Sequence, residues 1–166
     1  VNIIMDTFAA LAFASIKPEE NVMQEPPRKN SDFIIRSDMF KQMMITSLII
    51  VAVLLALFVI PIEGFTVGSK LFSSLFFTSF VMMQFANMFI VRGYKYRRSQ
   101  GESIKGLYTP AFLAVALMIL VGQIVIVQFG GDAFRVEPLS LATWGVICGV
   151  SFLIIVADLI FKLIRK

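Results

Sequence analysis

Asn2 and Asp6 lie four residues apart near the start of a strongly apolar stretch. Residues at i and i+4 share one face of an α-helix, so the amide and the carboxylate would point the same way. Their oxygens are the ligand type that hard cations such as calcium and magnesium prefer. Because a charge inside a membrane segment is costly, it marks a functional site by default. The pair is therefore a candidate metal site. The alternative is that residues 1–14 only border the membrane and that water solvates Asp6.

A second pair of polar side chains, Gln84 and Asn87, lies within the apolar stretch from Leu71 to Val91. Side chains three residues apart also share a helix face. The two amides would either line a polar pathway or hydrogen-bond neighbouring helices, which is the commoner use of amides in membranes. The residues by themselves leave both interpretations open.

Composition indicates an integral membrane protein. Of the 166 residues, 58% are hydrophobic and only 16% are charged, whereas soluble domains carry about 25% charged residues. The chain has no histidine, which excludes histidine-dependent catalysis and histidine zinc sites. The single cysteine, Cys148, can form no internal disulfide and is interpreted as a packing residue. No catalytic or cofactor-binding residue is predicted.

The apolar segments predict an all-α, polytopic membrane helix bundle. Four of them are long enough to cross a bilayer, which takes about 20 residues each. Residues 1–15 form a further apolar piece that is too short to span alone. The four full transmembrane helices are predicted at Met43–Ile62, Leu71–Val91, Tyr108–Phe129 and Leu139–Ile164.

The distribution of basic residues predicts the orientation. Of the 15 lysines and arginines, 13 lie in the segments 16–42 and 92–107 or in the tail after Phe161. The opposite loops hold only Lys70 and Arg135. Cytoplasmic loops carry the excess of basic residues, so the first set and the C-terminus are predicted to be cytoplasmic. The net charge of +4 then reflects topology and gives no indication of nucleic-acid binding.

Several runs along the chain resemble the plasma-membrane type of P-type calcium-transporting ATPases. Residues 1–9, which read Val-Asn-Ile-Ile-Met-Asp-Thr-Phe-Ala, are similar to the sixth transmembrane helix of that family. Residues 23–28 resemble the loop that follows it, and residues 122–131 resemble the end of the ninth helix. Residues 138–141, together with Trp144, resemble the entry to the tenth helix.

The resemblance implies one domain over residues 1–166, the C-terminal cation-ATPase transmembrane region. Residues 1–15 would be part of the sixth helix and 16–42 a cytoplasmic loop, followed by the transmembrane helices 43–62, 71–91, 108–129 and 139–164. The function implied is the C-terminal membrane module of an ATP-driven cation pump that exports calcium from the cytosol.

The resemblance also implies roles for individual residues. Asn2 and Asp6 correspond to calcium ligands. Met5 stands where sarcoplasmic-reticulum-type pumps have a threonine ligand, and Gln84 stands where they have a glutamate ligand. A thioether suits hard cations badly and an amide carries no charge, so the pattern implies one calcium site instead of two.

The family's phosphorylation motif, Asp-Lys-Thr-Gly-Thr, does not occur in this sequence. ATP and magnesium would therefore act only through domains outside it, and the segment alone is expected to have no activity. Its partners would be the remainder of the pump, namely the first to fifth helices and the cytoplasmic domains, and the lipid bilayer. Because the sequence begins with Val1, we expect it to be the tail of a larger protein.

Two other function classes remain open at this stage. The chain would fit a stand-alone four-helix membrane transporter or channel subunit, with Gln84 and Asn87 lining its path. It would also fit a structural membrane assembly module whose function is packing. An upstream reading frame with the phosphorylation motif would favour the pump, and a nearby start codon would favour a separate small protein.

Overall fold

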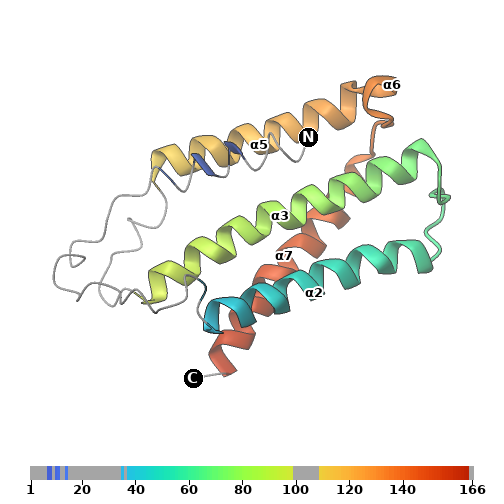
Figure 1. The fold of residues 1–166 in the computed structure, drawn as a ribbon. Helices are drawn as coiled ribbons and strands as arrows, with labels where there is room; N and C mark the ends of the chain where they lie inside the picture. The colour runs from blue at the N-terminus through green and yellow to red at the C-terminus, as the bar shows by residue number, and fades with distance from the viewer. Residues whose placement is uncertain are drawn as a thin grey trace.

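The computed structural model describes residues 7, 8, 10, 11, 14, 35, 37–98 and 109–164, without the side chains at 38, 93–98 and 157–164. This part of the chain is almost entirely helical (Figure 1), which confirms the all-α prediction. The named helices are α2 (Ser37–Val59), α3 (Lys70–Arg98), α5 (Pro110–Phe129), α6 (Gly131–Phe134) and α7 (Leu141–Ile164).

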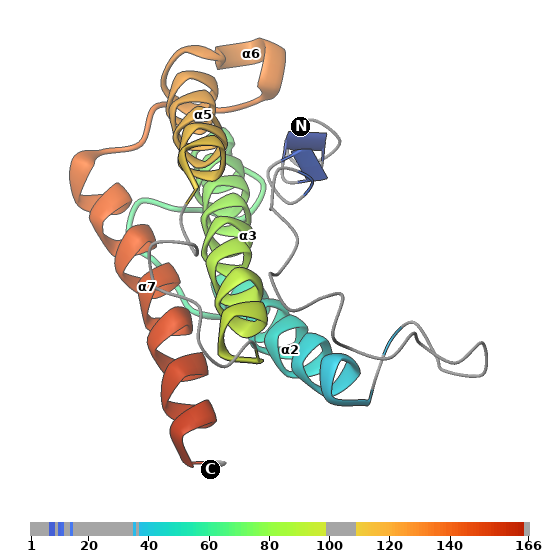
Figure 2. The same cartoon turned by 90° about the vertical axis from the view of Figure 1, so that its left-hand side faces the viewer.

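Helix α3 is the centre of the bundle. It packs against α2, α5 and α7, which lie on different sides of it in Figures 1 and 2. Its side chains accordingly include most of the buried polar residues, Ser74, Thr78, Ser79 and Arg92 among them. These four side chains are therefore held inside the bundle and away from lipid.

Three helices of the described part are long and apolar enough to cross a membrane: Met39–Val59, Lys70–Arg92 and Pro110–Phe129. Helix α7 has a shorter apolar stretch whose side chains are described, Leu141–Val156. The whole of α7 has 24 residues, which at about 1.5 Å per residue exceeds the roughly 30 Å hydrocarbon core. The chain is an integral membrane helix bundle.

Residues with known preferences at helix ends explain where some of the helices begin and end. Helix α2 ends at Val59, just before Pro61, because a proline disfavours helical backbone in the residue that precedes it. Helix α5 begins at Pro110, and the hydroxyl of Thr109 accepts a hydrogen bond from the backbone N–H of Phe112. This is the usual N-cap with proline in the first helical position.

Gly130 and Gly131 make the turn between α5 and α6. A Cβ at Gly130 would lie 2.3 Å from the carbonyl oxygen of Ile126, and Gly131 has a φ of +47°. The first position has no room for a side chain, and the second has a backbone conformation that glycine adopts at least cost. The two glycines that close the run 122–131 are therefore explained by this turn.

Some helix bounds differ from the predicted spans. Helix α2 begins at Ser37, before the predicted start at Met43. Helix α3 continues beyond Val91 as far as Arg98, so the basic residues that follow the span begin on the same helix. Hydropathy marks where the chain leaves lipid, whereas a helix continues for as long as its backbone hydrogen bonds are satisfied.

Candidate cation site and its surroundings

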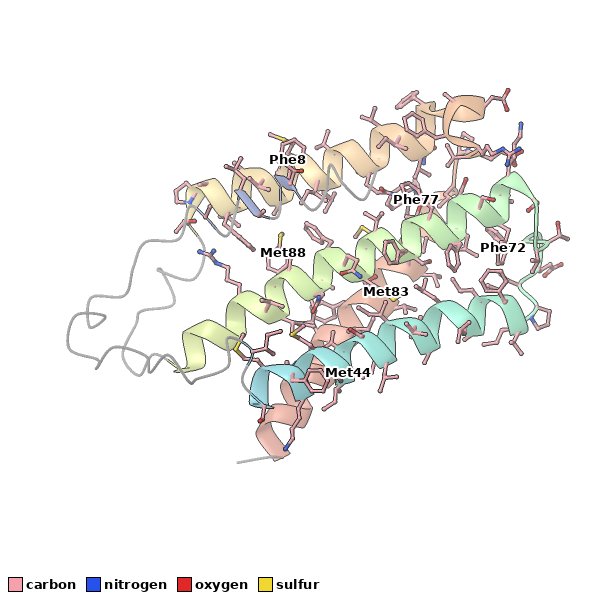
Figure 3. The ribbon with its side chains drawn as sticks, in the orientation of Figure 1. Phe8, Met44, Phe72, Phe77, Met83 and Met88 are labelled. Atoms are coloured by element: carbon pink, nitrogen blue, oxygen red, sulfur yellow. The ribbon has the colours of Figure 1, made fainter. Side chains whose placement is uncertain are left out.

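The candidate metal ligands Asn2 and Asp6 lie outside the described part of the chain, as does Met5. Close behind them in the sequence, Thr7 and Phe8 are helical. Phe8 packs against a cluster that α3 and α5 build together (Figure 3). The cluster consists of Met88, Phe112, Val115, Ala116 and Ile119, with Phe85 and Phe89 beside it.

Gln84 and Asn87 are half-buried on α3. Their neighbour Met83 faces a cluster with α2 and α7, while Phe85 and Met88 face the cluster that holds Phe8. At about 100° per residue, Gln84 and Asn87 lie between these two faces. Val91 shares this side of the helix and is 47% exposed, so α2, α5 and α7 leave this side uncovered.

The described part of the chain offers the two amides no hydrogen-bond partner that would assign them to packing. They lie on the side of α3 next to the face where Phe8 packs. Their role as pathway or packing residues stays a prediction, because the segment that carries Asn2 and Asp6 is not described at those positions.

Two other amides, for which the sequence analysis predicts no role, connect the helices. The Gln123 side-chain amide donates to the hydroxyl of Thr78 over 3.4 Å, inside the interface between α5 and α3. The Gln128 amide donates to the backbone carbonyl of Leu139 over 2.9 Å. Both glutamines lie in α5, which carries no charged residue, and isolated amides in apolar helices commonly bond across helix interfaces.

Ser74 forms a further polar contact between distant segments. Its hydroxyl accepts a hydrogen bond from the backbone N–H of Glu137 over 2.7 Å and donates to the carbonyl of Lys70 over 3.1 Å. Ser74 is fully buried. This hydroxyl anchors the segment before α7 to the first turn of α3, so a residue in the middle of the sequence positions the last helix.

Arg92 lies at the other end of α3, close to the cluster that holds Phe8. Its guanidinium carbon stands 4.3 Å from the centre of the Phe112 ring, and only 4% of the residue is exposed. A cation over an aromatic face is attracted by the ring quadrupole, worth about 2 kcal/mol when desolvated. The contact joins α3 to α5 on the face where Phe8 packs.

Acidic groups are sparse in the described part. Lys70 at the start of α3 forms an exposed ion pair with Asp132 of α6. The hydrogen bond from the Lys70 ammonium, and then its charge, lower the pKa of the Asp132 carboxyl. Because the pKa of Asp132 is lowered in the folded protein, the ion pair stabilises the fold at pH values above the ordinary aspartate pKa. This stabilisation is lost as the pH falls through the lowered pKa and the carboxylate is protonated.

Among the described residues, no three acidic, cysteine or histidine side chains come together in a way that could hold a metal ion. A cation site built on carboxylates would therefore need Asp6 or groups beyond the described part. The described helices α3 and α5 instead provide the surface against which Phe8 packs.

A family model described as "Cation transporting ATPase, C-terminus" matches residues 1–164. This chain belongs to that family. The match runs from the segment with Asn2 and Asp6 through the last helix, so it covers the candidate ligands and the bundle together. The resemblance expected from residues 1–9 and 122–131 is confirmed.

Known relatives of this family member include several pumps from plasma membranes. It is 32% identical over 154 residues to plasma membrane calcium-transporting ATPase 2 of Oreochromis mossambicus, covering 87% of this chain and 14% of the relative. It is 32% identical over 154 residues to plasma membrane calcium-transporting ATPase 3 of Homo sapiens, covering 87% and 12%.

A plant relative shows a similar identity and a similar coverage. The chain is 30% identical over 152 residues to putative calcium-transporting ATPase 13, plasma membrane-type, of Arabidopsis thaliana, covering 91% of this chain and 15% of the relative. The family member therefore spans between 12 and 15% of the length of these relatives, and it corresponds to the C-terminal membrane region of cation-transporting ATPases.

Proposed function

We propose that this chain is the C-terminal membrane module of an ATP-driven pump that exports calcium from the cytosol. The observation that carries the proposal is the family match over residues 1–164, which includes the oxygen pair Asn2 and Asp6. Relatives named as calcium-transporting ATPases at 30 to 32% identity support calcium as the ion. The all-helical membrane bundle supports a transport role in the membrane.

In this proposal Asn2 and Asp6 supply oxygen ligands to one calcium ion. Asp6 is the only carboxylate among residues 1–15, so it provides the charge that makes the site selective for a cation. Gln84 and Asn87 lie on the uncovered side of α3 and line the path or pack against neighbouring helices. Calcium is the transported substrate, and ATP with magnesium acts through other domains.

The partners proposed are the first to fifth helices and the cytoplasmic domains of the complete pump. Phe8, packed between α3 and α5, would link the sixth helix to this module. Movements of the cytoplasmic domains would then reach the bundle through the segment that carries the ligands.

The proposal predicts a transport stoichiometry of one. In vesicles that contain the complete protein, ATP should drive calcium uptake with one calcium ion moved per ATP hydrolysed, because Met5 and Gln84 offer a second ion neither a hydroxyl nor a carboxylate. Affinity for calcium depends on the number of charged ligands. The absence of ATP-dependent calcium uptake would contradict the function, and a ratio of two would contradict the single site.

Gln84→Ala tests the same inference at one residue. Its calcium affinity should stay within about 3-fold of wild type, since an uncharged amide adds little to a site whose affinity follows ligand charge. Asn2→Ala is the matched comparison and should weaken affinity more. A large loss in Gln84→Ala alone would place Gln84 among the ligands.

A cytoplasmic C-terminus is also part of the proposal, supported by the 13-to-2 division of basic residues. The test uses a background in which the exposed Cys148 is changed to serine. A cysteine at the exposed Ala133 should react with a membrane-impermeant maleimide added outside intact cells, and a cysteine at Ser99 should react only after permeabilisation. Labelling of position 99 from outside would reverse the orientation.

A further inference from the structure

Arg92 is the one charged side chain that is buried among those the structure describes. Only 4% of the residue is exposed, whereas the other charged side chains of the described part are exposed. Arg92 lies at the end of the apolar stretch Lys70–Arg92 of α3. A long basic side chain near the end of a membrane helix ordinarily extends its charge towards the headgroups. Arg92 instead places its guanidinium against α5, so its burial calls for an explanation.

A row of three aromatic rings leads from Arg92 along the interface between α3 and α5. The guanidinium carbon lies 4.3 Å from the centre of the Phe112 ring. The rings of Phe112 and Phe89 meet edge to face with their centres 5.3 Å apart, and those of Phe89 and Phe85 do so at 5.1 Å. Aromatic pairs prefer this geometry, so each ring restrains the orientation of the next.

The members of this row that α3 contributes lie on one face of the helix. Phe85, Phe89 and Arg92 follow one another at intervals of four and three residues, a spacing that places side chains on the same face. Phe8 packs against the cluster that contains Phe112, beside Phe85 and Phe89 (Figure 3). The contact between Arg92 and Phe112 therefore helps to fix the two helices between which Phe8 packs.

The position of Phe8 matters because Phe8 follows Asp6 by only two residues. So short a length of chain cannot absorb a displacement of Phe8 without moving Asp6. Oxygen ligands bind calcium at about 2.3 to 2.6 Å, and a binding site has to be held within about 0.5 Å of its working geometry. A small movement at the interface of α3 and α5 would therefore change the affinity of a site that uses Asp6.

We propose that Arg92 is a positioning residue for the candidate cation site and acts through Phe112 and Phe8. This role rests on the proposed function, which takes Asp6 as a calcium ligand. The guanidinium binds no cation itself, because it has only hydrogen-bond donors. Its charge is attracted to the face of the Phe112 ring, which holds α5 against α3 and keeps the cluster closed around Phe8. An apolar side chain of similar length would fill the space without this attraction.

Calcium activation of the complete protein tests this role. The measurements are the free calcium at half-maximal phosphoenzyme formation from ATP and the maximal phosphoenzyme level. Arg92→Met keeps an unbranched side chain without the charge. It should raise the half-maximal calcium about 3- to 10-fold, less than the 10- to 100-fold typical of partners bonded directly to metal ligands, and leave the maximal level within about 2-fold of wild type. Arg92→Lys restores a cation over the ring and should return the half-maximal calcium to within about 2-fold of wild type.

Ile154→Ala is the control for a general loss of packing. Ile154 is 5% exposed and belongs to the cluster between α2, α3 and α7, separate from the cluster against which Phe8 packs. The variant should lower the thermal unfolding midpoint, measured without calcium, at least as much as Arg92→Met does. Its half-maximal calcium should nevertheless stay within about 2-fold of wild type. An equal rise of the half-maximal calcium in both variants would reduce Arg92 to a general packing role and overturn the proposal.

Combining Arg92→Met with Phe8→Ala tests the route. Phe8→Ala alone should also raise the half-maximal calcium about 3- to 10-fold. Residues that act through one another are not additive, so the double variant should need no more calcium than the more strongly affected single variant. Multiplied effects, or an unchanged calcium affinity in Arg92→Met, would overturn the role of Arg92 and leave the proposed function standing. A wild-type protein without calcium-activated phosphoenzyme would contradict the proposed function itself.

Discussion

In the complete protein, Asp6→Asn should abolish calcium-dependent formation of a phosphoenzyme from ATP. The substitution keeps the shape of the side chain but removes the only carboxylate that residues 1–15 offer. A buried calcium site depends on the charge of its ligands, and an amide cannot replace that charge. The expected result is a loss of at least about 100-fold in calcium affinity, which is about 2.7 kcal/mol of binding free energy.

The measurement is the amount of acid-stable phosphoenzyme as a function of free calcium. The thermal unfolding midpoint of the purified variant, measured without calcium, serves as the control for a folded protein, and Asp6→Asn should retain the wild-type value. If calcium still activates the variant with the wild-type midpoint, Asp6 is not a ligand and the proposed site is wrong.

Phe112→Ala should destabilise the bundle more than any other single truncation at the interface of α3 and α5. Phe112 is fully buried, packs beside Met88 and carries the guanidinium of Arg92 over its ring. In soluble cores Phe→Ala costs about 3–5 kcal/mol. Part of that cost in a soluble protein comes from moving the side chain between the core and water. In a membrane protein the side chain moves between the interior and lipid, which are similarly apolar, so we expect about 2 kcal/mol, mainly from lost packing.

The matched control is the neighbouring residue. Leu113 lies on the same turn of α5 but is 49% exposed, so Leu113→Ala should change stability by less than about 0.5 kcal/mol. Both variants are compared with wild type by unfolding in mixed micelles with increasing fractions of denaturing detergent. Similar shifts for both would mean that the two positions meet the same environment, contrary to the packing described.

The buried polar contacts show why the role of a residue was harder to predict than its helix. Thr78 and Gln123 are far apart in the sequence and become partners only because α3 and α5 are neighbours. The sequence places Gln123 in an apolar helix but does not predict a partner for it. It could not indicate which of the hydroxyls along Leu71–Val91 would be that partner, since several lie at suitable depths.

For the candidate site, too, some features were predicted from the sequence and others come only from the structure. Types and spacing made Asn2 and Asp6 a candidate pair of oxygen ligands, with a solvated Asp6 as the alternative, and placed Gln84 and Asn87 on one helix face. The structure adds that this face of α3 is left uncovered by α2, α5 and α7 and adjoins the face that packs against Phe8. The ligand roles stay predictions, because Asn2 and Asp6 lie outside the described residues.

By itself the sequence determined the membrane class, the helices and the family, because each depends on local composition or on short runs of residues. Only the tertiary structure decided which side of each helix is buried. In a soluble helix the apolar stripe marks the core, but here lipid is as apolar as the interior. On α5 the exposed Leu117 and the buried Ile119 are chemically alike, so packing against α3, and no difference in hydropathy, separates the face inside the bundle from the face in lipid.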